Sequence, residues 1–137
     1  KEYRRQRQMC IRDSDDLPGA VSAWEAALAD SPADAVAQQG LSAARLMLRT
    51  RDADAAAVRA AAADGPDDVA AQLAVADLDV LGGHVEDAFA RLVRFIALHP
   101  GDDRETARAH LVDLYTVVGT DDPRVQASRR RLAAALF

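Results

Sequence analysis

The sequence predicts an all-α protein, a right-handed stack of antiparallel helix pairs with about seven helices. Thirty-one of the 137 residues are alanine and only 4% are aromatic, so the core must consist of small side chains between closely spaced helices. Prolines recur at an interval of 34 residues, and each is followed by a helix start signal. Between these starts, apolar residues return at helical spacing and glycines mark helix ends.

The repeat is defined by its start signals. A proline recurs three times at the same interval, and an aspartate stands two residues after each: Pro32 and Asp34, Pro66 and Asp68, Pro100 and Asp102. Proline lacks a backbone N–H group, but in the first helical turn that group has no intrahelical acceptor, so no hydrogen bond is lost. A carboxylate in the same turn is stabilised by the positive end of the helix dipole. Three equal start signals predict three stacked supersecondary units.

Start and stop signals together predict helices over 17–30, 33–49, 53–63, 67–81, 85–98, 103–118 and 122–136. Gly82, Gly83 and Gly119 mark two of the helix ends. Asp54 occupies a position that holds a small residue in the other units, so the helix over 53–63 is expected to be shifted or looser.

The motifs of these helices resemble the tetratricopeptide repeat. Its second-helix signature, Ala-x3-aromatic-x2-Ala-x4-Pro, is matched in full by Ala20, Trp24, Ala27 and Pro32. The first helices match less well, because Arg45 and Asp79 stand where the family has tyrosine, although Leu41 and Val75 keep its leucine position. The resemblance implies degenerate tetratricopeptide repeats that act in protein–protein interaction.

Residues 1–14 differ in composition from the rest of the chain. They hold five basic residues, one of which is the single lysine of the chain, Lys1, against two acidic ones. The run RRQRQMCIRDS resembles translated adapter sequence before metagenomic reading frames, so we expect a non-native or disordered leader over 1–14 and the repeat domain over 15–137. A basic arm for an acidic partner is the alternative. An upstream region would then be missing, and Trp24 and Leu28 would lack their cover.

Composition excludes several classes of protein. The net charge of −5 disfavours nucleic-acid binding, and the single cysteine, Cys10, permits neither a disulfide framework nor a cysteine-based zinc site. No run approaches the ~18 apolar residues of a membrane span, and no secretion signal opens the chain. We therefore expect a cytoplasmic protein that contacts neither membrane nor nucleic acid.

The sequence predicts no enzyme, no cofactor and no metal site. His84 and His99 lie at opposite ends of one predicted helix, roughly 20 Å apart, so one metal site cannot use both. His110 has no serine or cysteine partner at a recognisable spacing, which removes support for nucleophilic catalysis. Most acids fall at helix starts, where capping explains them: Asp67, Asp68, Asp102, Asp103, Asp121 and Asp122.

A groove along the first helices is the predicted site for unfolded clients. The positions expected to face it are Val36, Gln39, Ala43 and Leu46, then Ala70, Leu73, Asp77 and Val80. Some repeat proteins of this type clamp a carboxylate there with Lys and Asn, which these positions lack. The possible client groove therefore consists of the apolar residues Val36, Leu46, Leu73 and Val80. Filling of this groove by the protein's own helices is the alternative.

The final segment, RVQASRRRLAAALF, carries a second candidate site. Val125, Arg129, Leu132 and Leu136 share one helical face, followed by Phe137. This helix either packs back as a cap or offers an exposed apolar tip to a partner.

The layout of 15–137 resembles the C-terminal domain of the YbbN/CnoX family, thioredoxin-fold chaperedoxins of bacteria. The family ends in Arg-Arg-x-Leu-x-Ala-x-Leu-aromatic, which is matched by Arg129, Arg130, Leu132, Ala134, Leu136 and Phe137. The resemblance implies a co-chaperone whose last helix docks a GroEL-type chaperonin and whose apolar surface holds unfolded clients. The thioredoxin domain is not in this chain, and the alanine and arginine usage implies an actinobacterial member. A self-association scaffold, forming a homodimer, is the alternative function.

Overall fold

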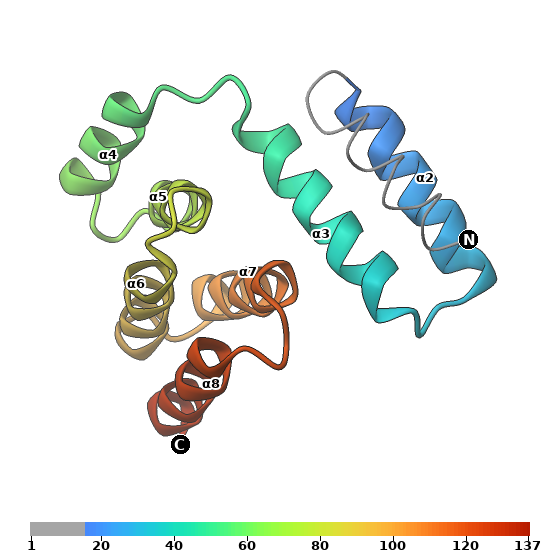
Figure 1. Cartoon of the computed structure of the whole chain (residues 1–137). Coiled ribbons are helices and arrows are strands. Elements are labelled where there is room, and N and C mark those ends of the chain that lie inside the picture. Colours follow the sequence, from blue (N-terminus) through green and yellow to red (C-terminus); the bar gives the residue numbers. More distant parts are fainter. Residues whose placement is uncertain (1–15) are drawn as a thin grey trace. The chain divides into compact units, whose positions relative to one another are not determined.

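The computed structural model describes residues 16–137 and shows seven helices in that part of the chain (Figure 1). They are α2 (Leu17–Asp30), α3 (Ala35–Thr50), α4 (Ala55–Asp64), α5 (Val69–Leu81), α6 (Val85–Leu98), α7 (Asp102–Val118) and α8 (Pro123–Leu136). The same residues contain no strand, so the prediction of an all-α helical repeat is confirmed. The predictions for 1–14, including Cys10, lie outside the described residues.

The helices form two compact units, divided between Arg51 and Asp52. The described part of the first unit consists of α2 and α3, which pack against each other. The second unit holds α4 to α8, and within it α5 contacts α4, α6 and α7, while α6 also contacts α7 and α8. The boundary falls in the turn between α3 and α4, inside the repeat domain predicted over 15–137.

Aspartates begin most of the helices. Asp34 accepts hydrogen bonds from the backbone N–H groups of Val36 and Ala37, and Asp68 accepts one from Ala71, as expected of N-caps. Pro32 and Pro66 therefore lie in the turn before the cap and not in the first helical turn. This is why α3 and α5 begin two residues later than predicted.

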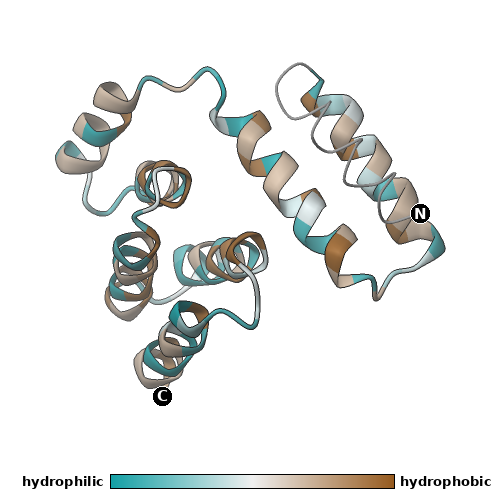
Figure 2. Ribbon diagram, viewed as in Figure 1, coloured by the Kyte–Doolittle hydropathy of each residue, from teal (hydrophilic) through white to brown (hydrophobic). Residues whose placement is uncertain are grey.

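The helix α4 is short, and Asp54 is the reason. Its carboxylate caps α4 by accepting from Ala56 N at 3.0 Å and Ala57 N at 3.3 Å, so the helix begins only at Ala55. The equivalent helix α6 has 14 residues against 10 in α4. Figure 2 shows α4 largely in the pale brown of weakly apolar residues, since seven of its ten residues are alanine.

Trp24 forms the centre of the first unit. It is only 5% exposed and packs with Ala20 of α2 and with Ala37 and Leu41 of α3. Gly40 permits this approach, because a Cβ atom there would lie 2.4 Å from the indole ring. The expectation that Trp24 lacks cover is wrong, since α3 supplies it, and Leu28 is half-buried against the same cluster.

The core of the second unit is built around α6. Phe89, Leu92 and Ile96 are buried there, and the Phe89 ring meets the edge of Tyr115 of α7 at a centroid distance of 4.9 Å. No helix within residues 16–137 has the length and hydropathy needed to cross a membrane.

Candidate binding groove and exposed helix end

A groove of about 850 Å³ opens in the second unit between α4 and α6, with α5 as its floor. The α6 residues that line it recur at helical spacing: Asp87, Ala90, Arg91, Arg94, Phe95 and Leu98. The opposite wall consists of Ala62 and Ala63 of α4 and of Pro66. The α4 wall presents alanine methyl groups to the groove, because seven of the ten residues of α4 are alanine.

The floor of the groove is fastened by an ion pair between α4 and α5. Arg59 Nη2 donates to Asp79 Oδ1 at 2.8 Å, and the Asp79 side chain is only 8% exposed. Asp79 occupies the position where the repeat pattern has tyrosine. The sequence shows that Asp79 replaces this tyrosine. No local pattern, however, indicates that Arg59, 20 residues earlier, is the partner of Asp79.

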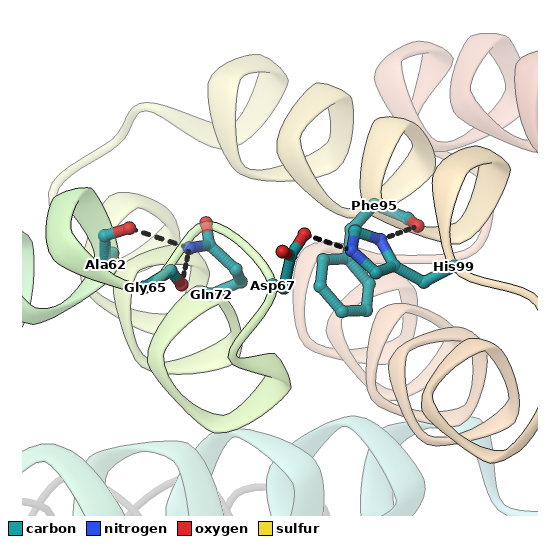
Figure 3. Close-up of polar contacts among 6 residues, drawn as sticks. All are labelled: Ala62, Gly65, Asp67, Gln72, Phe95 and His99. Carbon is teal, nitrogen blue, oxygen red and sulfur yellow. Dashed lines mark hydrogen bonds and ion pairs between the residues drawn. The ribbon is translucent and has the colours of Figure 1, made fainter.

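Gln72 connects three elements around the groove. Its Nε2 donates to the carbonyl oxygens of Ala62, at 3.0 Å, and Gly65, at 3.1 Å (Figure 3). Its Oε1 accepts a hydrogen bond from Arg91 Nη1 at 2.6 Å. Gln72 is buried, so these bonds satisfy its amide and hold α4, the following turn and α6 at fixed positions around α5.

His99 closes one end of the groove. Its Nε2 lies 2.7 Å from Asp67 Oδ1 and its Nδ1 lies 2.9 Å from the Phe95 carbonyl, while its ring stacks on Phe95 (Figure 3). The hydrogen bond to Asp67 and the Phe95 carbonyl both favour the imidazolium, so they raise the pKa of His99 above 6.5. Asp67 thus holds a histidine, and the expectation that helix capping explains it is wrong.

The other two histidines, His84 and His110, lie in different surroundings. His110 Nε2 lies 2.7 Å from Asp77 Oδ1, which places Asp77 in a buried pair between α5 and α7 and not on a groove surface as predicted. His84 begins α6 without a side-chain capping bond. Among residues 16–137, no group of three or more histidine, cysteine, aspartate or glutamate side chains is placed to hold a metal ion.

The predicted client groove along the first helices is wrong in two of its four residues. Val36 is 50% exposed, but Leu46 is buried in α3 and Val80 is buried in α5, so neither offers a surface. Leu73 is half-buried. Val36 and Leu46 also belong to the first unit, whereas Leu73 and Val80 belong to the second. The groove described above instead uses the second helices, α4 and α6.

The inner face of α8 is anchored in the second unit. Val125, Ser128 and Leu132 are buried, and Tyr115 of α7 shares a 2.5 Å hydrogen bond with Ser128. Burial of Tyr115 raises the pKa of its phenol. The expectation that Leu132 binds a partner is therefore wrong, because it packs within the unit. Neither Tyr115 nor Ser128 stood out in the sequence.

The outer face and the end of α8 are open to solvent. Arg129, Arg130 and Arg131 are exposed, and the Arg129 guanidinium lies over the Tyr115 ring, 5.7 Å from its centroid. Leu136 is half-buried, whereas the Phe137 side chain is fully exposed. The two alternatives predicted for this helix thus apply to different residues of it: Leu132 belongs to a packed cap and Phe137 to an exposed tip.

Comparison with known proteins places the chain in a family. The tetratricopeptide repeat family matches residues 48–137, which include the whole second unit. Uncharacterized proteins of Mycobacterium bovis and of two Mycobacterium tuberculosis strains are each 31% identical over 124 residues, which is 89% of this chain. The chain spans 40% of the length of these relatives. No solved structure matches it significantly. Because the repeat match covers most of the chain and agrees with its helices, the protein belongs to the tetratricopeptide repeat family, whose domains generally mediate protein–protein interactions.

Proposed function

We propose that this chain is the interaction module of a co-chaperone or holdase that docks a GroEL-type chaperonin through the end of α8. The observation that carries the proposal is the full exposure of Phe137 at the end of a helix whose inner face is anchored. A fixed helix presents its last aromatic side chain at a defined place, so little conformational freedom is lost on binding.

The energetics of such a contact are favourable. Complete burial of a phenylalanine side chain contributes about 1.5–3 kcal/mol. Arg130 and Arg131 are exposed beside it, and they steer the helix toward an acidic surface in a manner that weakens with salt. Arg129 is already engaged with Tyr115 and contributes less to a partner.

The chaperone assignment itself is supported by the resemblance of 15–137 to the chaperedoxin C-terminal domain. Client holding has the same support, and Val36, at 50% exposure, is the one exposed residue among the four predicted for it. The resemblance assigns redox activity to the thioredoxin domain of the family, so we propose none for the residues of this chain.

Surface plasmon resonance against an immobilised GroEL-type chaperonin tests the docking proposal. We expect the wild-type chain to bind and Phe137→Ala to bind about tenfold more weakly, as loss of one buried aromatic contact predicts. Val36→Ala, which removes an exposed apolar side chain from the first unit, is the matched control and should bind as the wild type does. Absence of wild-type binding, or equal binding of both variants, contradicts the proposal.

Sedimentation equilibrium on the same proteins distinguishes the alternative, a self-association scaffold. A mass that rises with concentration in the wild type and stays monomeric in Phe137→Ala indicates that the exposed tip binds a second copy. A monomeric wild-type chain removes that alternative.

A further inference from the structure

We infer that the groove between α4 and α6 is a separate binding site for an extended peptide segment in which carboxylate side chains stand beside apolar ones. The site lies in the second unit and uses none of the exposed residues of α8. It does not depend on the chaperone role proposed above, because the residues that form it are different.

The groove is large enough and rigid enough to receive such a segment. Its volume of about 850 Å³ falls within the roughly 300–1,000 Å³ of ligand pockets. Gln72 holds the carbonyl groups at the end of α4, and Arg59 holds Asp79 of the floor. A groove that is already formed costs little ordering on binding.

One cation that lines the groove has no partner among the described residues. Arg94 has no hydrogen bond or ion pair with any residue of 16–137, and Arg91 meets only the neutral amide of Gln72. Two of the lining carboxylates are occupied, since Asp79 pairs with Arg59 and Asp67 with His99.

The third lining carboxylate does not neutralise Arg94. Asp87 precedes Arg94 by seven residues on α6, which is about 10 Å along the helix axis. The guanidinium group of Arg94 therefore remains available to a carboxylate from outside, for which two-pronged hydrogen bonding is favourable.

Apolar surface lies directly beside these arginines. Leu98 follows Arg94 by one helical turn and is 64% exposed, and Pro66 and Ala63 line the facing wall. A peptide with an acidic side chain next to an aliphatic one can place its carboxylate on Arg94 and its aliphatic group on this apolar surface. A nucleic acid does not fit, because two arginines in a chain of net charge −5 make no basic track along a phosphate backbone.

Fluorescence polarisation with two labelled hexapeptides tests the site on the full chain. One peptide alternates leucine with glutamate, and the other alternates leucine with glutamine; both have blocked ends. We expect the glutamate peptide to bind at least about fivefold more tightly, the effect of one exposed charge pair of about 1 kcal/mol. Arg94→Gln should remove that preference and leave the helical circular dichroism unchanged, because Arg94 has no partner to lose.

Arg108→Gln is the matched control, since it removes a partly exposed arginine of α7 that does not line the groove and should leave binding of both peptides unchanged. Equal binding of the two peptides, no binding of the glutamate peptide at millimolar protein, or full retention of its preference in Arg94→Gln overturns the inference. A concentration-dependent dimer that Arg94→Gln dissociates would assign the groove to a second copy of the chain and overturn it also. None of these outcomes bears on chaperonin binding by Phe137, so failure of either proposal can be recognised separately.

Discussion

The two units of the chain contain the same inter-helix contact with the charges exchanged. In the first unit Glu25 of α2 pairs with Arg45 of α3 at 3.3 Å, and in the second Arg59 of α4 pairs with Asp79 of α5 at 2.8 Å. Each residue of the second pair lies 34 positions after its counterpart in the first. The two repeats therefore carry an ion pair at equivalent positions with reversed polarity.

The two pairs differ in their surroundings. Both side chains of the Glu25–Arg45 pair are about half exposed, at 52% and 51%, whereas the Asp79 side chain is 8% exposed. An exposed pair gains little over hydration, but a buried carboxylate without its cation is costly. The ion pair is therefore expected to contribute little to the stability of the first unit and more to the stability of the second.

The units also differ in how they fill the space above this contact. In the first unit Trp24 packs over Gly40, and 34 residues later the corresponding residues are Val58 and Ala74. Both Val58 and Ala74 are only half-buried, whereas the indole ring of Trp24 is buried. A large ring over a glycine fills the α2–α3 interface, whereas the second unit has two smaller, half-buried side chains at the equivalent positions.

The largest expected effect comes from truncating the ring. Trp24→Ala should destabilise the first unit by about 3–5 kcal/mol, because it empties the centre of the α2–α3 core. Val58→Ala should cost about 1 kcal/mol, since that side chain is only half-buried. Amide hydrogen exchange over 16–51 and 52–137 in each variant separates the two units. Equal loss of amide protection in the two variants would show that Trp24 contributes no more to the stability of its unit than Val58 does to the stability of the other.

A smaller difference is expected between the two ion pairs. Arg59→Ala should cost about 1–3 kcal/mol by leaving the buried Asp79 unpaired, and Arg45→Ala should change stability by no more than about 0.5 kcal/mol. Urea unfolding followed by circular dichroism measures both. The double variant Arg59→Glu with Asp79→Arg, which copies the polarity of the first unit, should recover part of the loss. Failure of the double variant to exceed Arg59→Ala would contradict a positional ion pair.

The smallest effect depends on pH and concerns the second unit alone. The first unit has no counterpart of the His99–Asp67 pair, because the described residues of that unit, 16–51, contain no histidine. Because the pKa of His99 is raised, its contribution is complete below the unfolded pKa of 6.5 and is lost as the pH rises through the folded pKa. We expect NMR titration to show a raised pKa that returns toward 6.5 in Asp67→Asn. An unchanged value in that variant would mean that Asp67 is not the cause.

The helices and their order were determined by the sequence alone, because their signals are local. Capping acts within three residues and proline acts on its own turn, so Asp34, Asp68 and the 34-residue period place each helix end to within two residues. Even the short α4 follows from Asp54, whose carboxylate reaches only the next turn.

Only the tertiary structure decided which of these residues are free to bind. Leu132 of α8 and Phe137, which directly follows that helix, are both apolar, yet one is buried and the other exposed. The groove likewise depends on alanine side chains of α4 failing to reach α6, and Arg94 is available because other cations already hold Asp79 and Asp67. Burial and pairing depend on neighbours 20 or more residues away, and a pattern read along the chain contains the spacing of residues but not the partners that folding brings to them.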